Sequence, residues 1–547
     1  MNILSKYNKS RHLIINWLLL VFVLISLNSC IDTDLNEIPL SSVGAENTLV
    51  SKAGFEAYIN GLVWAAREEY SKDDNTYFIT NFPGTDVAED AGAEYFTYRN
   101  WVSYMTPIRG EVLKTWDWAY SKMIPQANTI ISYANKSEIE SIWENEADKN
   151  KVIAEARFFR AYTYNLLANL YGGVPIVDDV VTTPIFDYAR NSREEVYRFA
   201  KEDLEFASDW LPATTQIDGR IVKATANHLL TEVNISLNLY DEAIKSASDV
   251  IDSGLYSLMT SRFGVAKDQP GDVFSDLFID GNFNRSSGNT ESIYVWQFED
   301  LTAGGGGTNN GNQAIRNCGP FLTKMGDSKG FNNVATAELG RGVGRVRGTN
   351  YSLYTIWNDP NDIRNSEYNI RRDFYYNNPG SALYGQKISF ANATAEDTLR
   401  NMYPYPRKVE GTPWNSSPTS GKITDDVYVY RLAETYLLRA EAYMKKGDLA
   451  NAAKDINTVR ARANASPISA NDVTLDFILD ERARELFLEE PRRRTLIRLG
   501  LLVERVRKYG LMEDWRNTIQ DYHGLWPIPQ DVIDANYGSV IEQNPGY

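Results

Sequence analysis

The sequence predicts a mainly α fold, in which a scaffold of paired helices carries a loop-rich insertion with a few short strands. Three observations support this prediction. Residues 154–177 have the pattern of one long buried helix, two later segments have the pattern of helical hairpins, and the stretch between those hairpins loses helical periodicity. The chain has 547 residues, more than one hydrophobic core needs, and its 43% hydrophobic and 23% charged residues are ordinary for a folded protein.

The helix predicted within residues 154–177 has one strongly apolar face. Bulky apolar residues recur there at three- and four-residue steps: Phe158, Phe159, Tyr162, Leu166 and Leu170. Ala154, Ala161 and Ala168 repeat every seven residues and leave a shallow groove in which a second helix can approach closely. Gly172 and Gly173 then end the helix, and Pro175 prevents its resumption. The pattern therefore predicts a central buried helix with a scaffold role.

Other helices are predicted on both sides of this one. Ser192 and Glu195 form a capping box at the start of a helix that runs to about Leu211. Four further segments have helical spacing of their apolar residues: 52–69, 112–134, 472–488 and 492–509.

Two segments have the pattern of helical hairpins, residues 224–253 and 434–463. In both, an apolar residue precedes an alanine by three just after the turn between the helices, as in Tyr240 to Ala243 and Leu449 to Ala452. Small residues at this place allow paired helices to stack, which is the tetratricopeptide-like arrangement. The two repeats are degenerate and separated, so we expect a tetratricopeptide-like scaffold and not a regular solenoid.

The insertion between these hairpins, about residues 255–426, is rich in Gly, Asn, Asp and Pro and contains four consecutive glycines at 304–307. A short strand is predicted at 292–298. We expect the insertion to lie as a set of loops on the helical scaffold, which itself comprises about 47–254 and 427–547.

The N-terminus has the features of a targeting segment. Lys6, Lys9 and Arg11 precede an apolar run at 13–27 that is shorter than the roughly 20 residues needed to span a bilayer. The run ends at Cys30, in a context that resembles the bacterial lipoprotein box. We therefore expect a signal peptide at 1–29, lipidation of Cys30 and a polar tether at 30–46. The net charge of −16 argues against nucleic-acid binding, because phosphates require basic patches.

Several motifs resemble the SusD/RagB family, outer-membrane nutrient-binding lipoproteins of Bacteroidetes-type bacteria. The main match is the segment ARFFRAYTYNLLANLYGGVPIV at 156–177. Further matches lie at 481–486 (ERAREL), 493–500 (RRTLIRLG), 525–529 (LWPIP) and 543–547 (QNPGY). Pro491 and Thr495 depart from the family pattern, which has a glycine and an acidic residue at these positions.

The resemblance implies a single SusD-like domain at 47–547, anchored by lipid in the outer membrane and exposed at the cell surface. It implies that the protein binds oligosaccharides and delivers them to a SusC-like TonB-dependent transporter, without a cofactor, a metal or a catalytic step. Members of the RagB type instead take peptides, so peptide cargo stays open as an alternative.

Candidates for catalysis are few. Beyond the targeting segment the chain holds only His228 and His523, and Cys318 is most simply a buried free thiol. Asp359, Asn361 and Asp362 lack the spacing of a calcium loop. Paired carboxylates could serve a glycoside hydrolase, and a loop at 73–107 supplies four candidates: Asp86, Glu89, Asp90 and Glu94. We consider this the weaker alternative and expect no enzyme.

The same loop, 73–107, is the first candidate for ligand binding, because it is long and combines aromatic with acidic residues. Sugar rings stack their C–H faces on aromatic side chains, while their hydroxyls pair with polar groups. The predicted ligand-binding residues are Asp86, Tyr95, Tyr98 and Trp101 in the loop, with Trp296 and Trp357 in the insertion. The competing interpretation is that most of these aromatic residues belong to the core, and for Trp296 we favour burial.

Overall fold

A computed structural model describes residues 44–71, 76–92, 98–306, 311–325, 341–376, 379–389, 391, 393–417 and 420–547. The predicted signal peptide, Cys30 and nearly all of the predicted tether lie outside the described residues.

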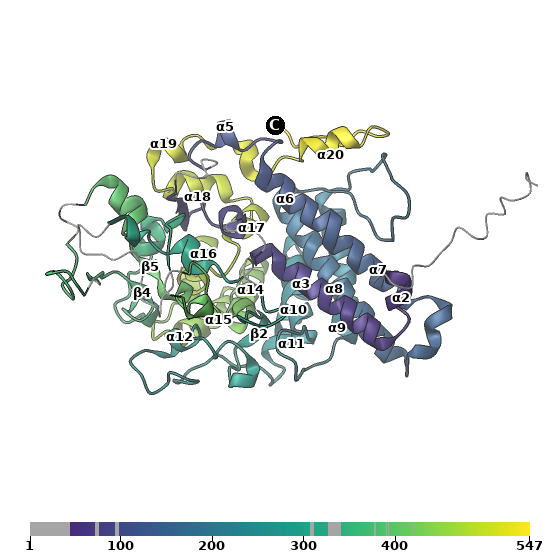
Figure 1. The fold of residues 1–547 in the computed structure, drawn as a ribbon, viewed down its shortest axis with the longest axis horizontal. Helices are drawn as coiled ribbons and strands as arrows, with labels where there is room; N and C mark the ends of the chain where they lie inside the picture. The colour runs from purple at the N-terminus through teal and green to yellow at the C-terminus, as the bar shows by residue number, and fades with distance from the viewer. Residues whose placement is uncertain are drawn as a thin grey trace, which may run out of the picture.

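Helices dominate both ends of the described chain, as predicted (Figure 1). The first group is α2 (Ala45–Thr48), α3 (Lys52–Ser71), α4 (Thr76–Asn81), α5 (Trp101–Tyr104), α6 (Gly110–Trp118), α7 (Ile124–Ala134), α8 (Glu146–Tyr171), α9 (Arg193–Trp210), α10 (Lys223–Ser236) and α11 (Tyr240–Ile251). The second group is α14 (Leu432–Lys446), α15 (Leu449–Arg462), α16 (Leu475–Leu486), α17 (Arg492–Arg498), α18 (Leu502–Tyr509), α19 (Glu513–Arg516) and α20 (Gln530–Ala535). In the described part of the insertion, the α-helices are the short α12 (Val273–Asp276) and α13 (Ala314–Cys318), and the other helical pieces are 3₁₀ or π turns.

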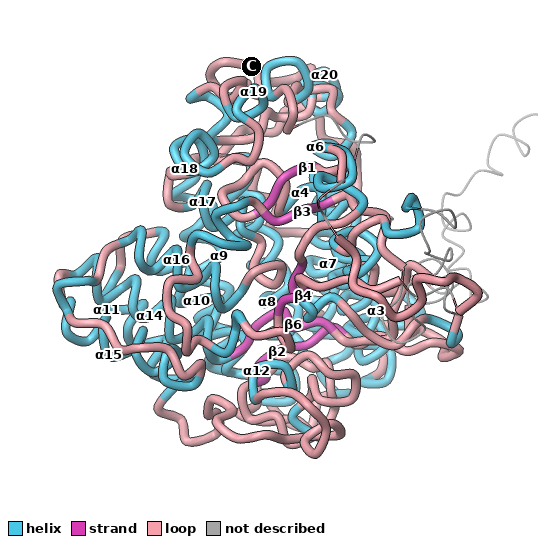
Figure 2. Tube along the Cα trace, turned by 90° about the vertical axis from the view of Figure 1, so that its left-hand side faces the viewer, coloured by secondary structure: helices cyan, strands magenta, loops and turns pink. Residues whose placement is uncertain are grey.

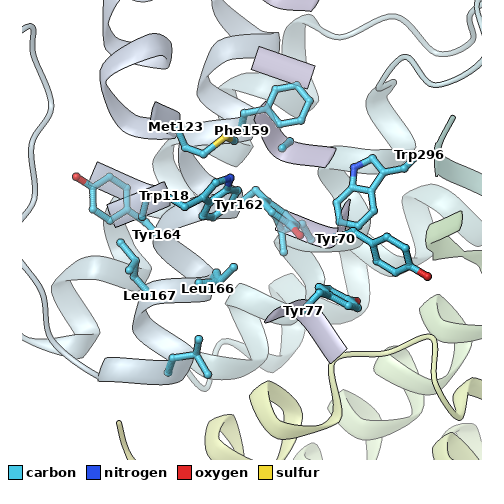
Figure 3. Packing of buried hydrophobic residues seen from close by; sticks show 14 of the residues in the cluster. Tyr70, Tyr77, Trp118, Met123, Phe159, Tyr162, Tyr164, Leu166, Leu167 and Trp296 are labelled. Atoms are coloured by element: carbon cyan, nitrogen blue, oxygen red, sulfur yellow. The ribbon is translucent and has the colours of Figure 1, made fainter. Parts of the chain in front are cut away.

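Helix α8 is the central buried helix that the sequence predicts. Ala154, Ala161 and Ala168 are fully buried, as the seven-residue row requires. The Arg160 guanidinium donates to both carboxylate oxygens of Asp203 on α9, at 2.7 and 2.9 Å, which joins the two helices at a buried point. Figure 3 shows the apolar face of α8, with Phe159, Tyr162 and Leu166 among the core residues.

The end of α8 explains why its signature motif is so specific. Gly172 ends the helix with φ of 78°, a conformation that side-chain-bearing residues rarely adopt. The hydroxyl of Tyr164 accepts a hydrogen bond from the amide of Val177 at 2.7 Å, which folds the extended segment back onto the helix. The C-terminal motifs dock at the same place. The side chain of Asn544 donates to the carbonyls of Tyr171 and Trp526, at 2.9 and 2.6 Å.

The predicted helical hairpins are confirmed as α10–α11 and α14–α15, and these four helices lie side by side in Figure 2. Asn238 takes the turn of the first hairpin with φ of 60°, and Gly447 takes the turn of the second with φ of 89°. Ala243 and Ala452, the predicted stacking positions, are fully buried.

The described strands form three two-stranded antiparallel sheets. These sheets are β1 (Ala88–Asp90) with β3 (Val346–Gly348), β2 (Ser292–Trp296) with β6 (Val427–Arg431), and β4 (Ile370–Arg371) with β5 (Tyr405–Pro406). Strand β2 confirms the strand predicted at 292–298, and β6 leads directly into α14. The first two sheets tie the insertion to other parts of the chain, whereas β4 and β5 both lie within the insertion and form a two-stranded sheet among its described residues.

A buried network of charges surrounds α16. Glu485 accepts hydrogen bonds from Arg364 at 2.9 Å, from Arg431 at 2.5 Å, and from Arg462. Glu481, one turn earlier, accepts from Arg460 at 2.8 Å. An unpaired charge in the interior costs several kcal/mol of folding free energy. The charged motif at 481–486 can be buried because its carboxylates pair with arginines from the insertion and from α15.

Two predicted elements are wrong. The helix expected at 492–509 is two helices, α17 and α18, because Gly500 adopts φ of 69° between them. The segment at 73–107 is not an open loop. Its described part contains α4, β1 and α5, and residues 77–92 are buried throughout.

Candidate functional site

Asp86, which was predicted to meet a ligand on a surface loop, lies in the interior. Its fully buried carboxylate accepts hydrogen bonds from Arg492 at 2.9 and 2.6 Å and from Arg505 at 2.8 Å. Burial alone would raise the pKa of Asp86, but the two guanidinium charges outweigh burial and hold the pKa below its ordinary value. The predicted surroundings were therefore wrong: this carboxylate neutralises two buried arginines.

Tyr98 and Trp101 are also interior residues. Their rings lie 5.1 Å apart, and the guanidinium of Arg493 lies 4.2 Å from the Tyr98 ring. Gly84 approaches both rings so closely that an added Cβ would come within 2.9 Å of them. Both side chains are packed in the interior, and with exposed fractions of 2% for Tyr98 and 0% for Trp101 they offer no surface to a ligand.

The remaining predicted residues are placed differently. Trp296 is buried beside Tyr70 and Tyr77, with ring centroids at 5.7 and 6.4 Å, which agrees with the favoured interpretation of this residue as core (Figure 3). Trp357 is half-buried, and its indole N–H donates to the carbonyl of Ser352 at 2.9 Å. Tyr95 lies outside the described residues. The structure therefore brings Tyr98 and Trp101 together, but it does not join them to Trp296 or Trp357 in one exposed site.

The carboxylates considered for hydrolysis are enclosed as well. Glu89 on β1 accepts a hydrogen bond from the amide of Leu511 at 3.2 Å, and burial raises the pKa of Glu89 to about 7. Asp90 is buried too, with Arg99 at 3.3 Å, and Glu94 lies outside the described residues. Neither Asp86, Glu89 nor Asp90 offers a carboxylate to solvent.

The other candidate groups are packed inside the protein. His228 is buried between the ring of Tyr430, at 4.2 Å, and the hydroxyl of Thr435, at 2.8 Å. His523 is buried in a turn, and Cys318 is a buried free thiol. Within the described ranges no cluster of three or more His, Cys, Asp or Glu side chains could hold a metal ion. Of the helices that the structure describes, none combines the length and the apolar character that crossing a bilayer requires.

Exposed aromatic residues gather instead on a β-hairpin of the insertion that the sequence analysis missed. We call its described residues between 372 and 388 the tyrosine hairpin. Tyr375 pairs with Lys387, and the amide of Ile388 donates to the carbonyl of Phe374 at 2.8 Å. Phe374 and Ile388 are buried, whereas Tyr375 points outward and is half exposed. The available signal was the aromatic run at 374–376 followed by Asn-Asn-Pro-Gly, which is typical of a hairpin turn.

Polar groups accompany these tyrosines. Lys387 and Asp373 form an exposed ion pair at 2.7 Å beside Tyr375, and Tyr384 near the turn is 58% exposed. Next to the hairpin, the guanidinium of Arg372 lies 6.0 Å from the ring of the half-exposed Tyr354. Flat apolar rings combined with hydrogen-bonding groups suit a sugar, whose ring has apolar faces and whose hydroxyls both donate and accept.

A cavity of ≈ 290 Å³ lies next to strand β4, just before the tyrosine hairpin in the chain. Phe278 and Tyr368 supply aromatic wall, and Arg407, Lys408 and Asp425 supply polar groups of both signs. Burial lowers the pKa of Lys408 to about 8, and burial followed by the nearby charge of Asp280 raises the pKa of Asp425. The cavity is close to the lower limit of about 300 Å³ for small-molecule sites.

Comparison with known families identifies the class of protein. A model described as the SusD family matches residues 290–547, and a model described as "Starch-binding associating with outer membrane" matches residues 42–233. Together these matches cover most of the chain, which therefore belongs to the SusD/RagB family. Carbohydrate binding and association with the outer membrane are properties of this family.

Individual relatives agree with this assignment. SusD-like protein P2 of Formosa agariphila is 25% identical over 542 residues, covering 96% of this chain and 98% of the relative. The starch-binding protein SusD of Bacteroides thetaiotaomicron is 38% identical over 128 residues, which is 22% of each chain.

Solved structures support the fold. A SusD homologue from Bacteroides thetaiotaomicron matches with a TM-score of 0.71 at 21% identity, covering 93% of this chain and 99% of the other. A structure described as a laminarin-binding SusD-like protein matches with a TM-score of 0.65 at 20% identity, covering 91% of this chain and all of the other. At these identities the likeness concerns the fold and leaves the ligand of this chain open.

Proposed function

We propose that this protein captures oligosaccharides at the cell surface and delivers them to a SusC-like TonB-dependent transporter in the outer membrane. The observation that supports it best is the tyrosine hairpin, where Tyr375 is exposed beside the Asp373–Lys387 ion pair and Tyr384 is exposed near the turn. Large exposed aromatic side chains whose backbone is held by cross-strand hydrogen bonds are available for stacking on a sugar ring. The cavity lined by Tyr368, a few residues before the hairpin in the sequence, would accept a further sugar unit of the bound oligosaccharide.

Binding requires no chemical step in this proposal. The acidic residues considered for hydrolysis, Asp86, Glu89 and Asp90, are buried, so the protein would act by affinity alone. Lipid on Cys30 would hold it at the outer membrane, where the transporter supplies the energy for uptake. The ligand-binding roles of Tyr95 and Trp357 stay predictions from the sequence, whereas Asp86, Tyr98, Trp101 and Trp296 would have to leave the interior to touch a ligand.

The test is calorimetric titration of the protein with a panel of oligosaccharides and a panel of peptides. We expect an oligosaccharide to bind, and the double variant Tyr375→Ala/Tyr384→Ala to weaken that binding at least tenfold, about 1.4 kcal/mol. Tyr104→Ala is the matched control, because this tyrosine is also exposed but lies on α5. Binding of peptides alone would replace the proposed cargo, and an unchanged affinity in the double variant would exclude the hairpin as the site.

Hydrolysis of the bound oligosaccharide would contradict the non-enzymatic part of the proposal. It can be followed in the same samples by chromatography of the ligand after prolonged incubation.

A further inference from the structure

Two arginines of the insertion, Arg347 on β3 and Arg372 directly after β4, have no acidic partner among the residues that the structure describes. Many buried arginines of this protein pair with carboxylates, as in the network around α16. Arg347 and Arg372 instead donate to neutral oxygens, and neither forms an ion pair within the described ranges. Arg493 also donates only to carbonyls but is fully buried, whereas these two lie beside the half-exposed Tyr354. A guanidinium that is partly removed from water and not neutralised by the protein can pair with an anion from outside.

Arg372 is held next to the ring of Tyr354. Its guanidinium lies 6.0 Å from the ring centroid, and its Nη2 donates to the carbonyl of Leu353 at 2.8 Å and to the side chain of Asn365 at 2.7 Å. Its Nε and Nη1 have no hydrogen-bond partner in the described part of the chain. These two nitrogens can donate to a ligand, while the contacts of Nη2 fix the guanidinium before the ligand arrives.

Arg347 adds a second positive charge at the same tyrosine. The residue is 9% exposed, and its Nε and Nη1 donate to the carbonyls of Thr398 at 3.1 Å and Gly348 at 3.2 Å. Gly348 packs so closely on the turn that carries Tyr354 that an added Cβ would come within 2.7 Å of a side chain in that turn. Burial lowers the pKa of Arg347 and of Arg372, and after burial the hydroxyl of Tyr354 is the largest influence on the pKa of both. The protein therefore leaves both positive charges incompletely compensated.

The acidic residues on the neighbouring segments do not neutralise the two arginines. Those within the described ranges are Glu89, Asp373, Glu396, Asp397 and Glu410. None of them forms an ion pair with Arg347 or Arg372. Asp373 pairs with Lys387 at 2.7 Å, and Glu410 pairs with Arg371 at 2.6 Å.

Glu89 needs separate consideration, because it lies directly opposite Arg347 in the pair of β1 with β3. Its carboxylate accepts a hydrogen bond from the amide of Leu511, and its charge influences the pKa of Arg347 less than Tyr354 does. The net charge of −16 is spread over the whole chain, and salt screens charges beyond about 8 Å at physiological ionic strength. The groups around Tyr354 therefore decide which charge binds there.

We propose that Tyr354, Arg347 and Arg372 form a subsite for an anionic sugar unit, whose ring lies against Tyr354 and whose carboxylate or sulfate group accepts hydrogen bonds from Arg372. Arg347 supplies a second positive charge close by. This inference rests on the proposed function and adds its substrate class, an oligosaccharide that carries negative charge. Carboxylate and sulfate oxygens share the chemistry that the subsite recognises, because guanidinium N–H groups donate strongly to both.

The test adds two matched pairs to the calorimetric panel of oligosaccharides. Oligogalacturonides are compared with their carboxyl-reduced form, and carrageenan oligosaccharides are compared with their desulfated form. We expect the tightest-binding member of the panel to be anionic, and removal of its charged groups to weaken binding by at least about tenfold. A difference in the first pair assigns the subsite to a carboxylate, and a difference in the second pair assigns it to a sulfate. Binding of the anionic form should also weaken with rising ionic strength.

Variants locate the anion. Arg372→Gln removes the charge, and in this variant the loss of the ligand's charged groups should cost less than about threefold in affinity, because their partner is gone. Arg372→Lys keeps a positive charge and should recover part of the difference. The matched control is Arg285→Gln, since Arg285 also lies over a tyrosine ring, that of Tyr256 at 4.4 Å, and donates to carbonyls in another part of the insertion. The control should retain the full difference of the wild type.

The other outcomes overturn the inference and separate it from the proposed function. A neutral oligosaccharide as the tightest ligand would refute the anionic substrate class and leave the proposed function standing. A tenfold difference that persists in Arg372→Gln would place the anionic group elsewhere on the protein. Binding of none of the oligosaccharides would refute the proposed function itself, and this inference with it.

Discussion

At the scale of single residues, Asp86 shows how a charged side chain can serve the fold. Truncating one partner of a buried ion pair leaves the other charge uncompensated, which typically costs about 3–5 kcal/mol. Asp86→Ala removes the carboxylate that Arg492 and Arg505 share and leaves Arg492 with Glu490 and Arg505 with Asp476, so we expect a loss of stability at the lower end of this range in urea-induced unfolding. Asp86→Asn keeps the shape of the side chain and should lose less stability. It can therefore still be measured if the alanine variant does not fold.

Exposed Asp531 offers the control for this prediction, since Asp531→Ala should change stability by less than about 0.5 kcal/mol. Unchanged stability of Asp86→Asn together with lost oligosaccharide binding would return Asp86 to the role that the sequence first suggested.

Glu89 gives a prediction for pH dependence at the same scale. Its pKa is about 7 in the folded protein, against an ordinary value of 4.5. The folded state therefore holds this proton more tightly than the unfolded chain does, and the stabilisation is complete below pH 4.5 and is lost as the pH rises through 7. Glu89→Gln cannot ionise, so relative to this variant the wild type should lose up to about 3 kcal/mol of unfolding free energy between pH 4.5 and pH 8. Parallel stability curves of the two proteins over this range would show that Glu89 does not titrate as expected.

At the scale of elements, helices with local signals could be predicted from the sequence. The spacing in α8, the capping box of α9 and the two hairpins depend on residues within a few positions of one another, and the structure has them where the pattern placed them. The break at Gly500 was missed, because a glycine inside a helical pattern is compatible both with a helix and with a turn.

The candidate site was predicted less well, because burial depends on partners far away in the sequence. By composition, the aromatic and acidic segment at 73–107 resembles a surface loop. In the structure it is buried because Arg492 and Arg493 of α17, which follow it by some 400 residues in the sequence, pack against it. The tyrosine hairpin has the opposite problem. Whether Phe374 or Tyr375 faces solvent depends on the strand register, which is set by the pairing of Tyr375 with Lys387. This register cannot be predicted from composition alone.

At the scale of the whole molecule, lipid on Cys30 is expected to attach the protein to the outer membrane. Acyl chains contribute about 0.8 kcal/mol of membrane-binding free energy per buried CH₂. Removing them should therefore decide whether the protein is found in the membrane fraction or in the soluble fraction. In cells that lack the transporter, Cys30→Ala should move the protein from the membrane fraction to the soluble fraction, as followed by immunoblotting. Membrane association that persists in the cells without the transporter would refute the lipid anchor.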